Sequence, residues 1–265
     1  MKFWIPVIAL VLSAGVLYAD DFVIDEPQSD PSKTKANVPD MSAVKLTAIS
    51  LGSVPTTATL PKGSFLVESI FYDEGGLTAR AVVGILDFLS IGVSENFDKL
   101  IGSDSTTVNL PSAYVKLNVL NTGAFGIALG FDTFAIGRNG SVALSNGLSY
   151  PESGFFACAG WNYRIFRGPD FLSFGFRVPL SPYELPSLTN SSLFLGTSMT
   201  ISDHFELGAT IENLYLDFQR YDRILPSAIV TFMPIPEFRV FIELQYEFYS
   251  SQVNRILGLN YCAKF

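Results

Sequence analysis

The sequence predicts an all-β fold, a transmembrane antiparallel up-and-down β-barrel of about twelve strands. First, 48% of the 265 residues are hydrophobic and only 16% are charged, with a mean hydropathy of +0.33. Soluble domains carry roughly 25% charged residues. Second, no apolar run after the N-terminal region is long enough to form a transmembrane helix. Third, many short stretches alternate between apolar and polar or small residues, which is the period of a β-strand.

The first 19 residues form a predicted signal peptide. Lys2 supplies the positive start, Ile5 to Leu12 is a short apolar stretch, and Ala19 is a small residue suited to cleavage. We therefore expect cleavage after Ala19 and export from the cytoplasm. No cysteine lies near the cleavage position, which argues against a lipoprotein anchor.

Residues 20–62 differ in composition from the rest of the chain. Asp, Pro, Ser, Thr and Lys dominate between Asp20 and Asp40, and no apolar periodicity is present there. We interpret 20–62 as a flexible periplasmic segment, in which Val44 to Leu51 could still pair as a short extra strand. The barrel is predicted over 63–265.

Within the barrel region, short alternating stretches and turn signals follow one another. The predicted strands are 64–72, 77–86, 89–97, 111–120, 124–135, 154–165, 171–180, 191–201, 204–216, 223–233, 237–249 and 254–265. In the stretch from Phe238 to Phe248, apolar residues occupy every second position, and Phe241 is the one exception on the polar face. The first and tenth strands alternate poorly.

The connections between predicted strands alternate in length through most of the chain. Tight links are predicted at 87–88, 121–123, 167–170, 202–203 and 234–236, with longer links between most of them. Short periplasmic turns and longer outside loops are typical of outer-membrane barrels. If the first strand rises from the periplasm, all five tight links fall on the periplasmic side.

The last strand carries a further signal. Leu257, Leu259, Tyr261, Ala263 and Phe265 share one face, and the chain ends on an aromatic residue. This pattern resembles the closing strand of bacterial outer-membrane β-barrels, in which a C-terminal Phe is part of the assembly signal. The resemblance implies the cell outer membrane as location, with its lipid and the barrel-assembly machinery as partners, and Tyr261 and Phe265 as the signal residues.

Four short stretches resemble one family more closely. They are 71–77, 84–94, 100–102 and 128–132. The chain is similar there to a family of uncharacterised outer-membrane β-barrel proteins of diderm bacteria. That resemblance implies fold and location, and it brings no activity with it.

A soluble β-sandwich or lipocalin-like barrel is the alternative fold, because periodicity alone does not separate inside from outside. Glycine favours the membrane barrel. It is a poor strand residue against solvent but makes room in a crowded lumen. The glycines on the small or polar faces are Gly84, Gly92, Gly126, Gly130, Gly160, Gly175, Gly196, Gly208 and Gly258.

The sequence contains no pattern of residues that indicates a catalytic site or a metal site. His204 is the single histidine and follows a predicted periplasmic turn, so we predict no enzymatic activity. One histidine and two separated cysteines, Cys158 and Cys262, offer no metal-ligand spacing, and we expect no cofactor, metal site or disulfide. A net charge of −8 argues against nucleic acid as a partner.

The predicted lumen carries charges of both signs. The candidate lumen-lining residues are Arg80, Lys116, Asp132, Arg164, Arg177, Glu206, Glu212, Arg239, Glu243 and Glu247. Such a mixed set fits either a pore or internal ion pairs that fill the barrel. We expect a narrow channel for passive passage of small solutes. The alternative is a closed barrel with a structural or surface-interaction role and no transport.

Overall fold

The computed structural model describes residues 49–102, 105–108, 111–132, 154–164, 170–179, 191–215, 224–248 and 251–264. The predicted signal peptide, residues 20–48 of the predicted periplasmic segment, three of the predicted outside links and Phe265 lie outside these ranges. All described residues belong to one compact unit, which begins at Ser42.

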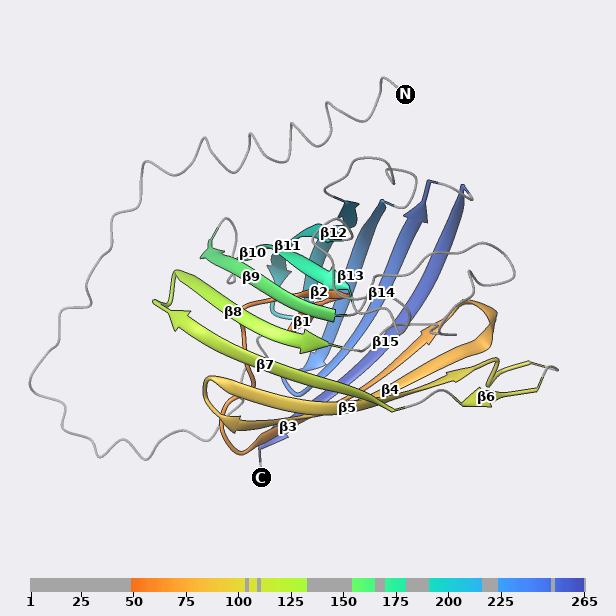
Figure 1. The fold of residues 1–265 in the computed structure, drawn as a ribbon, viewed down its shortest axis with the longest axis horizontal. Coiled ribbons are helices and arrows are strands. Elements are labelled where there is room, and N and C mark those ends of the chain that lie inside the picture. Colours follow the sequence, from red (N-terminus) through yellow and green to blue (C-terminus); the bar gives the residue numbers. More distant parts are fainter. Residues whose placement is uncertain are drawn as a thin grey trace, which may run out of the picture. The chain divides into compact units, whose positions relative to one another are not determined.

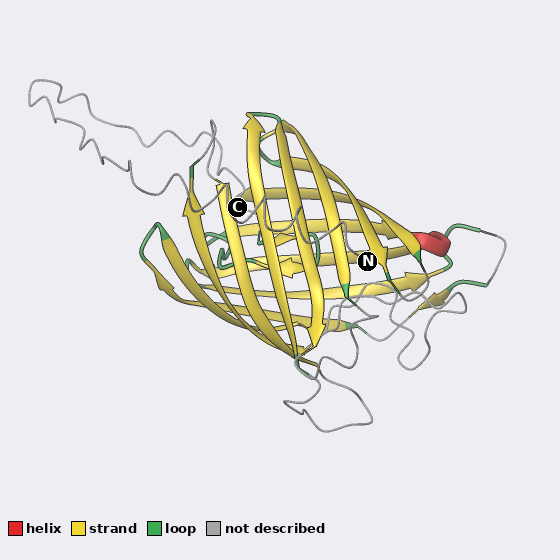
Figure 2. Ribbon diagram, turned by 90° about the horizontal axis from the view of Figure 1, so that it is seen from above, coloured by secondary structure: helices red, strands yellow, loops and turns green. Residues whose placement is uncertain are grey.

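Twelve antiparallel strands form a closed barrel wall (Figures 1 and 2). The strands are β3 (Ser64–Tyr72), β4 (Gly76–Leu86), β5 (Leu89–Asp98), β7 (Ser112–Asn121), β8 (Phe125–Asp132), β9 (Gly154–Tyr163), β10 (Asp170–Pro179), β11 (Ser192–Ser202), β12 (Phe205–Tyr215), β13 (Leu225–Ile235), β14 (Phe238–Glu247) and β15 (Gln252–Lys264). Each wall strand pairs with the next one along the chain, and β15 closes the barrel by pairing with β3. The predicted fold class is confirmed.

Four short elements lie outside this wall. β6 (Thr107–Val108) pairs with the end of β5, and the 3-10 turn η2 (Asp73–Gly75) joins β3 to β4. β1 (Ser50–Leu51) and β2 (Val54–Pro55) form a separate two-stranded sheet. In the described ranges, no helix has the length and apolar character needed to cross a membrane.

The predicted strand bounds agree with the observed bounds to within two residues at almost every end. The exception is the predicted strand 124–135, because β8 is described only to Asp132 and residues 133–135 lie outside the described ranges. This agreement follows from the period of two, since a barrel wall has one polar and one apolar face along its whole height.

The outer face of the wall is apolar. Val93 is 61% exposed, Ile242 53% and Phe155 52%, and each alternates with buried neighbours along its strand. Similar outward residues on other strands are Val67, Val115, Leu129, Phe174, Leu193, Leu207, Val230 and Leu257. Soluble proteins rarely expose so much contiguous apolar surface. A closed wall with an apolar outside satisfies every backbone group within lipid, so this is a barrel of the outer-membrane type.

Aromatic pairs lie toward both ends of the wall. Phe205 and Phe232 contact each other beside the turn that precedes β12, at the predicted periplasmic end of the wall, with ring centroids 5.0 Å apart. Tyr246 and Phe248 contact each other at the opposite end of β14, also at 5.0 Å. Aromatic residues at both interfaces are typical of outer-membrane barrels, where their rings meet the lipid headgroups.

Inward aromatic rings explain some of the inward glycines. The Phe241 ring lies over Gly258, its partner on β15, so that a β-carbon at Gly258 would overlap the ring. The Phe156 ring lies over Gly130 of β8 in the same way. These glycines make room inside the barrel, as the sequence predicts, and the large residue that needs the room sits on the neighbouring strand.

Candidate functional site in the barrel lumen

Charged side chains line the inside of the wall. The predicted lumen residues that are buried there are Arg80, Lys116, Asp132, Arg177, Glu206, Glu212, Arg239, Glu243 and Glu247. Arg164 differs, because β9 ends at Tyr163 and Arg164 is exposed just beyond it. A side chain past the end of its strand no longer follows the inward and outward alternation.

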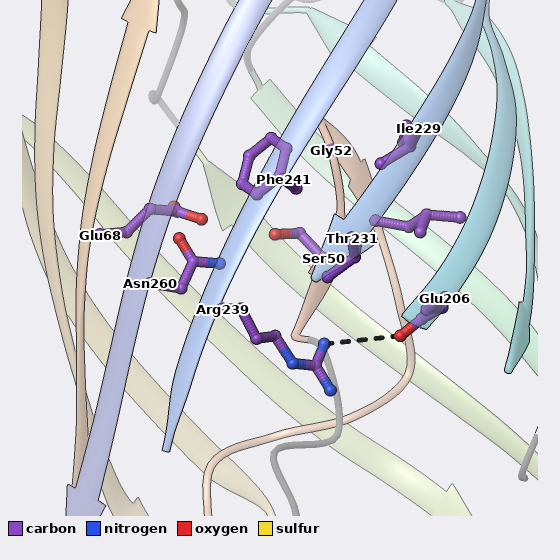
Figure 3. A pocket seen from close by; sticks show the side chains of 10 residues that line it. Ser50, Gly52, Glu68, Glu206, Ile229, Thr231, Arg239, Phe241 and Asn260 are labelled. Carbon is purple, nitrogen blue, oxygen red and sulfur yellow. Dashed lines mark ion pairs between the residues drawn. The ribbon is translucent and has the colours of Figure 1, made fainter. Parts of the chain in front are cut away.

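Ion pairs join wall strands inside the barrel, as three examples from the described part of the chain show. Arg80 pairs with Glu68. Arg177 Nη1 lies 3.2 Å from Glu212 Oε2, with both side chains almost fully buried. The third pair joins Arg239 and Glu206 at 4.0 Å and is drawn in Figure 3. Pairing of this kind offsets the cost of taking charges out of water.

Residues 49–60, called the inner segment here, lie inside the barrel. The segment starts as a hairpin in which Ser50 faces Pro55 and Leu51 faces Val54. The Thr56 amide extends the ladder by donating to the Ile49 carbonyl at 3.3 Å. The chain reverses at Gly52, whose φ of +55° favours glycine. The hairpin pairs only with itself and adds no strand to the wall.

The apolar residues of the inner segment pack against different parts of the wall. Ile49 and Leu60 join one buried cluster, with Leu66, Val82, Tyr114 and Cys262. Leu51 joins a second, with Ile70, Tyr72, Ile229, Phe241 and Ile256. Val54 joins a third, with Ala128, Phe156, Cys158 and Phe194. These partners come from β3, β4, β7, β8, β9, β11, β13, β14 and β15. The inner segment therefore spans the lumen from wall to wall.

Hydrogen-bond donors of β7 hold the backbone of the inner segment. Lys116 Nζ donates to the carbonyl oxygens of Ile49 and Ala58, at 2.6 and 2.7 Å. Asn118 Nδ2 donates to the Thr57 carbonyl at 2.8 Å.

β9 and β10 continue the row of donors. Ser173 Oγ donates to the Pro55 carbonyl at 2.7 Å, and Arg177 Nη2 donates to the Ser53 carbonyl at 3.3 Å. Cys158 Sγ lies 3.4 Å from the Thr56 carbonyl. We call Lys116, Asn118, Cys158, Ser173 and Arg177 the donor row. Its members replace the water that carbonyl oxygens would otherwise bind.

Carboxylates face the tip of the hairpin from the other side. Ser53 Oγ donates to Glu212. The carboxylate of Glu243 lies against Gly52, where any β-carbon would overlap it. The tip of the inner segment is thus held between donors on β10 and acidic residues on β12 and β14.

The inner segment leaves the lumen along the turn between β4 and β5. Thr59 Oγ1 donates to the Asp87 carbonyl at 2.6 Å, and the Leu60 amide donates to Ser90 Oγ at 2.9 Å. The Lys62 amide then bonds Asp87 Oδ1 at 2.9 Å. This turn is one of the predicted periplasmic turns, so the segment enters the lumen from the end at which β3 begins.

Little free space remains beside the hairpin among the described residues. A cavity of about 20 Å³ lies between Ser50, Glu68, Thr231, Arg239 and Asn260, as Figure 3 shows. Such a volume holds roughly one water molecule. With the inner segment in place, this cavity is too small for a solute.

The inner segment is the feature that the sequence reasoning missed. Residues 49–60, which belong to the predicted flexible segment 20–62, are folded against the inside of the wall. Of the stretch from Val44 to Leu51, Ser50 and Leu51 do form a strand, but it pairs with β2 and not with the barrel. The reason is that the apolar side chains of the segment find inward-facing apolar partners.

The sequence also singles out one histidine, two cysteines and a tyrosine of the closing strand, and the structure places each of them. His204 is exposed in the turn before β12, with Nδ1 2.9 Å from the Met233 carbonyl oxygen. Cys158 and Cys262 are free and buried. Tyr261 points outward, with its ring 6.2 Å from that of Phe65.

Several solved outer-membrane proteins are similar to this chain. One is the KdgM porin, with 11% identity over 75% of this chain and 98% of that chain, at a TM-score of 0.45. Another is Omp33 of Acinetobacter baumannii, with 10% identity, 76% and 97% coverage, and a TM-score of 0.43.

A third is an outer membrane channel from Pseudomonas putida F1, with 12% identity, 79% and 98% coverage, and a TM-score of 0.42. No protein-family model and no curated protein sequence matches this chain. Identities and TM-scores this low do not show what this chain does. Its function therefore has to be argued from the residues of its own lumen.

Proposed function

We propose that this protein is an outer-membrane channel for passive passage of small solutes through a narrow lumen. One observation carries the proposal: the wall encloses enough space for a two-stranded piece of chain in addition to its own side chains. Eight-stranded barrels are filled by their own side chains, and barrels of sixteen or more strands hold open water. A twelve-stranded wall lies between these limits, and its lumen accommodates the two-stranded hairpin of the inner segment.

The polar inner wall supports the same function. The donor row and the ion pairs formed by Arg80, Arg177 and Arg239 give the lumen groups that bind water and polar solutes. A purely structural barrel has no need for such buried charges, since apolar side chains of similar volume are at least as stabilising. The closed structural or surface-interaction barrel remains the alternative, and it requires the inner segment to stay in the lumen permanently.

Single-channel recording in planar bilayers tests the proposal. We expect discrete current steps from the refolded chain without its signal peptide, and larger, steadier steps from the same chain lacking residues 49–60. Folding of both chains is checked by their heat-modifiable migration on gels. If both chains are folded and neither conducts, the channel function is wrong and the closed barrel takes its place.

Location and assembly belong to the same proposal. We propose that the chain is cleaved after Ala19 and inserted into the outer membrane by the barrel-assembly machinery, which reads Tyr261 and Phe265. The outward position of Tyr261 supports this, because an assembly factor meets the outer face of the closing strand.

Replacing Phe265 with serine should strongly lower the amount of folded protein in the outer membrane. The reason is that the closing strand would lose its terminal aromatic residue. Outer-membrane fractions are compared by immunoblot with those of a Tyr163→Ser variant, which loses an aromatic residue on β9 instead. Equal amounts of the Phe265 variant and the unaltered chain would contradict the role of the terminal residue.

A further inference from the structure

The inner segment is separable from the barrel that holds it. β1 and β2 form strand pairing only with each other, so the segment can leave without breaking any pairing between wall strands. Its polar contacts to the wall run through side chains, chiefly those of the donor row. The segment also connects directly to the periplasmic start of β3, which gives it a way out of the lumen.

Lys116 is the member of the donor row that depends most on the segment. It is fully buried at mid-wall, and it donates to two carbonyl oxygens of the inner segment, those of Ile49 and Ala58. Among the described carboxylates, none forms an ion pair with it. If the segment leaves, the ammonium group loses both acceptors and faces the open lumen, where water or the acceptor oxygens of a solute take their place.

We infer that the donor row around Lys116 is a binding site for anionic solutes with acceptor oxygens, such as carboxylates, and that the inner segment occupies this site as a displaceable plug. This inference rests on the proposed channel function and adds the solute class and the means of closure. Solute and segment compete for the same donors, so the solute binds only when the segment has left. Solute binding therefore shifts the population toward the open form. While no solute is present, the plug occupies the lumen for most of the time, and the current steps come from its brief departures.

A disulfide between the segment and the wall tests the plug. A β-carbon at Gly126 would lie 3.1 Å from the Thr57 β-carbon. Disulfides need about 3.5–4.5 Å, so a small shift allows the bond. We design Thr57→Cys with Gly126→Cys in a chain that also carries Cys158→Ser and Cys262→Ser. The control is Thr57→Cys alone in that same background.

We expect oxidation of the double-cysteine chain to abolish the current steps and reduction to restore them. The current steps of the control should change under neither treatment. Three outcomes are distinct. Loss of current on oxidation supports the plug. Current that persists with the disulfide formed overturns the plug but leaves the channel function intact. Absence of current from every folded variant, including the chain lacking residues 49–60, removes the channel function itself.

The solute class is tested in the chain lacking residues 49–60, with potassium acetate as the probe. Across an acetate gradient, Lys116→Met should shift the reversal potential toward cation preference, because the lumen loses its unpaired cation. Lys264→Met removes the same charge from an exposed position near the end of β15 and should shift the potential less. Equal shifts from the two variants, or no shift from Lys116→Met, would overturn the anion site.

Discussion

Replacing Arg177 with methionine is expected to destabilise the folded barrel by about 3–5 kcal/mol. The change removes the partner of Glu212, whose side chain is 1% exposed, and it also removes a donor to the Ser53 carbonyl. Glu212 would keep only its contact with Ser53. A buried carboxylate without its cation costs far more than the pair itself contributes. The free energy of unfolding is measured by urea titration in lipid vesicles, followed by the fluorescence of Trp161 on the outer face.

The exposed ion pair of the same type serves as the control. Arg255 Nε lies 3.8 Å from Asp73 Oδ1, and the Arg255 side chain is 77% exposed. Arg255→Met should therefore change the stability by about 1 kcal/mol or less. The double variant Arg177→Met with Glu212→Leu should recover part of the loss, because no charge is then left unpaired. If Arg177→Met is as mild as Arg255→Met, the buried pair has no structural role.

Arginine at Leu244 is expected to cost about 2–4 kcal/mol, the cost reported for the lipid face near the bilayer midplane. Leu244 is 48% exposed on β14, and it is one of the two central members of a run of six outward residues from Phe238 to Phe248. Its side chain meets the centre of the hydrocarbon layer, where a guanidinium group has no water. The same urea titration in vesicles gives the free energy.

The matched control for this variant is the same substitution at an outward position closer to the membrane interface. Phe248 is the last of the six outward residues, and arginine there should cost about 0–1 kcal/mol because the side chain reaches the interface. Leu244→Met, which keeps the apolar character and about the same volume, should cost less than about 1.5 kcal/mol. Equal costs for Leu244→Arg and Phe248→Arg would place the membrane differently along β14.

The wall could be predicted from the sequence because one physical rule acts at every position. Along β14, outward residues meet lipid and inward residues meet the lumen, so the apolar pattern has a period of two from end to end. The ion pair between Arg177 and Glu212 is harder to foresee. Periodicity places both side chains inward, but which acid meets which base depends on the register between strands.

The inner segment was missed in the sequence analysis because the residues that indicate it belong to the wall strands and not to the segment itself. The first and tenth predicted strands alternate poorly since their inward faces carry Leu66, Ile70 and Ile229, which pack on the segment. Phe241 breaks the polar face of β14 for the same reason. Apolar residues on the inward face of a barrel predict something apolar inside it, and among the described residues outside the wall, 49–60 meet that need.

The two native cysteines allow the residence time of the plug to be measured in the unaltered chain. Cys158 lies against the Thr56 carbonyl, and Cys262 packs in the cluster with Ile49 and Leu60, so the inner segment covers both thiols. A charged, water-soluble thiol reagent reaches them only after the segment has moved. With reagent in excess, the labelling rate should stop rising with concentration and level off at the opening rate. The same curve recorded with acetate present would show whether a carboxylate makes these openings more frequent or only prolongs them.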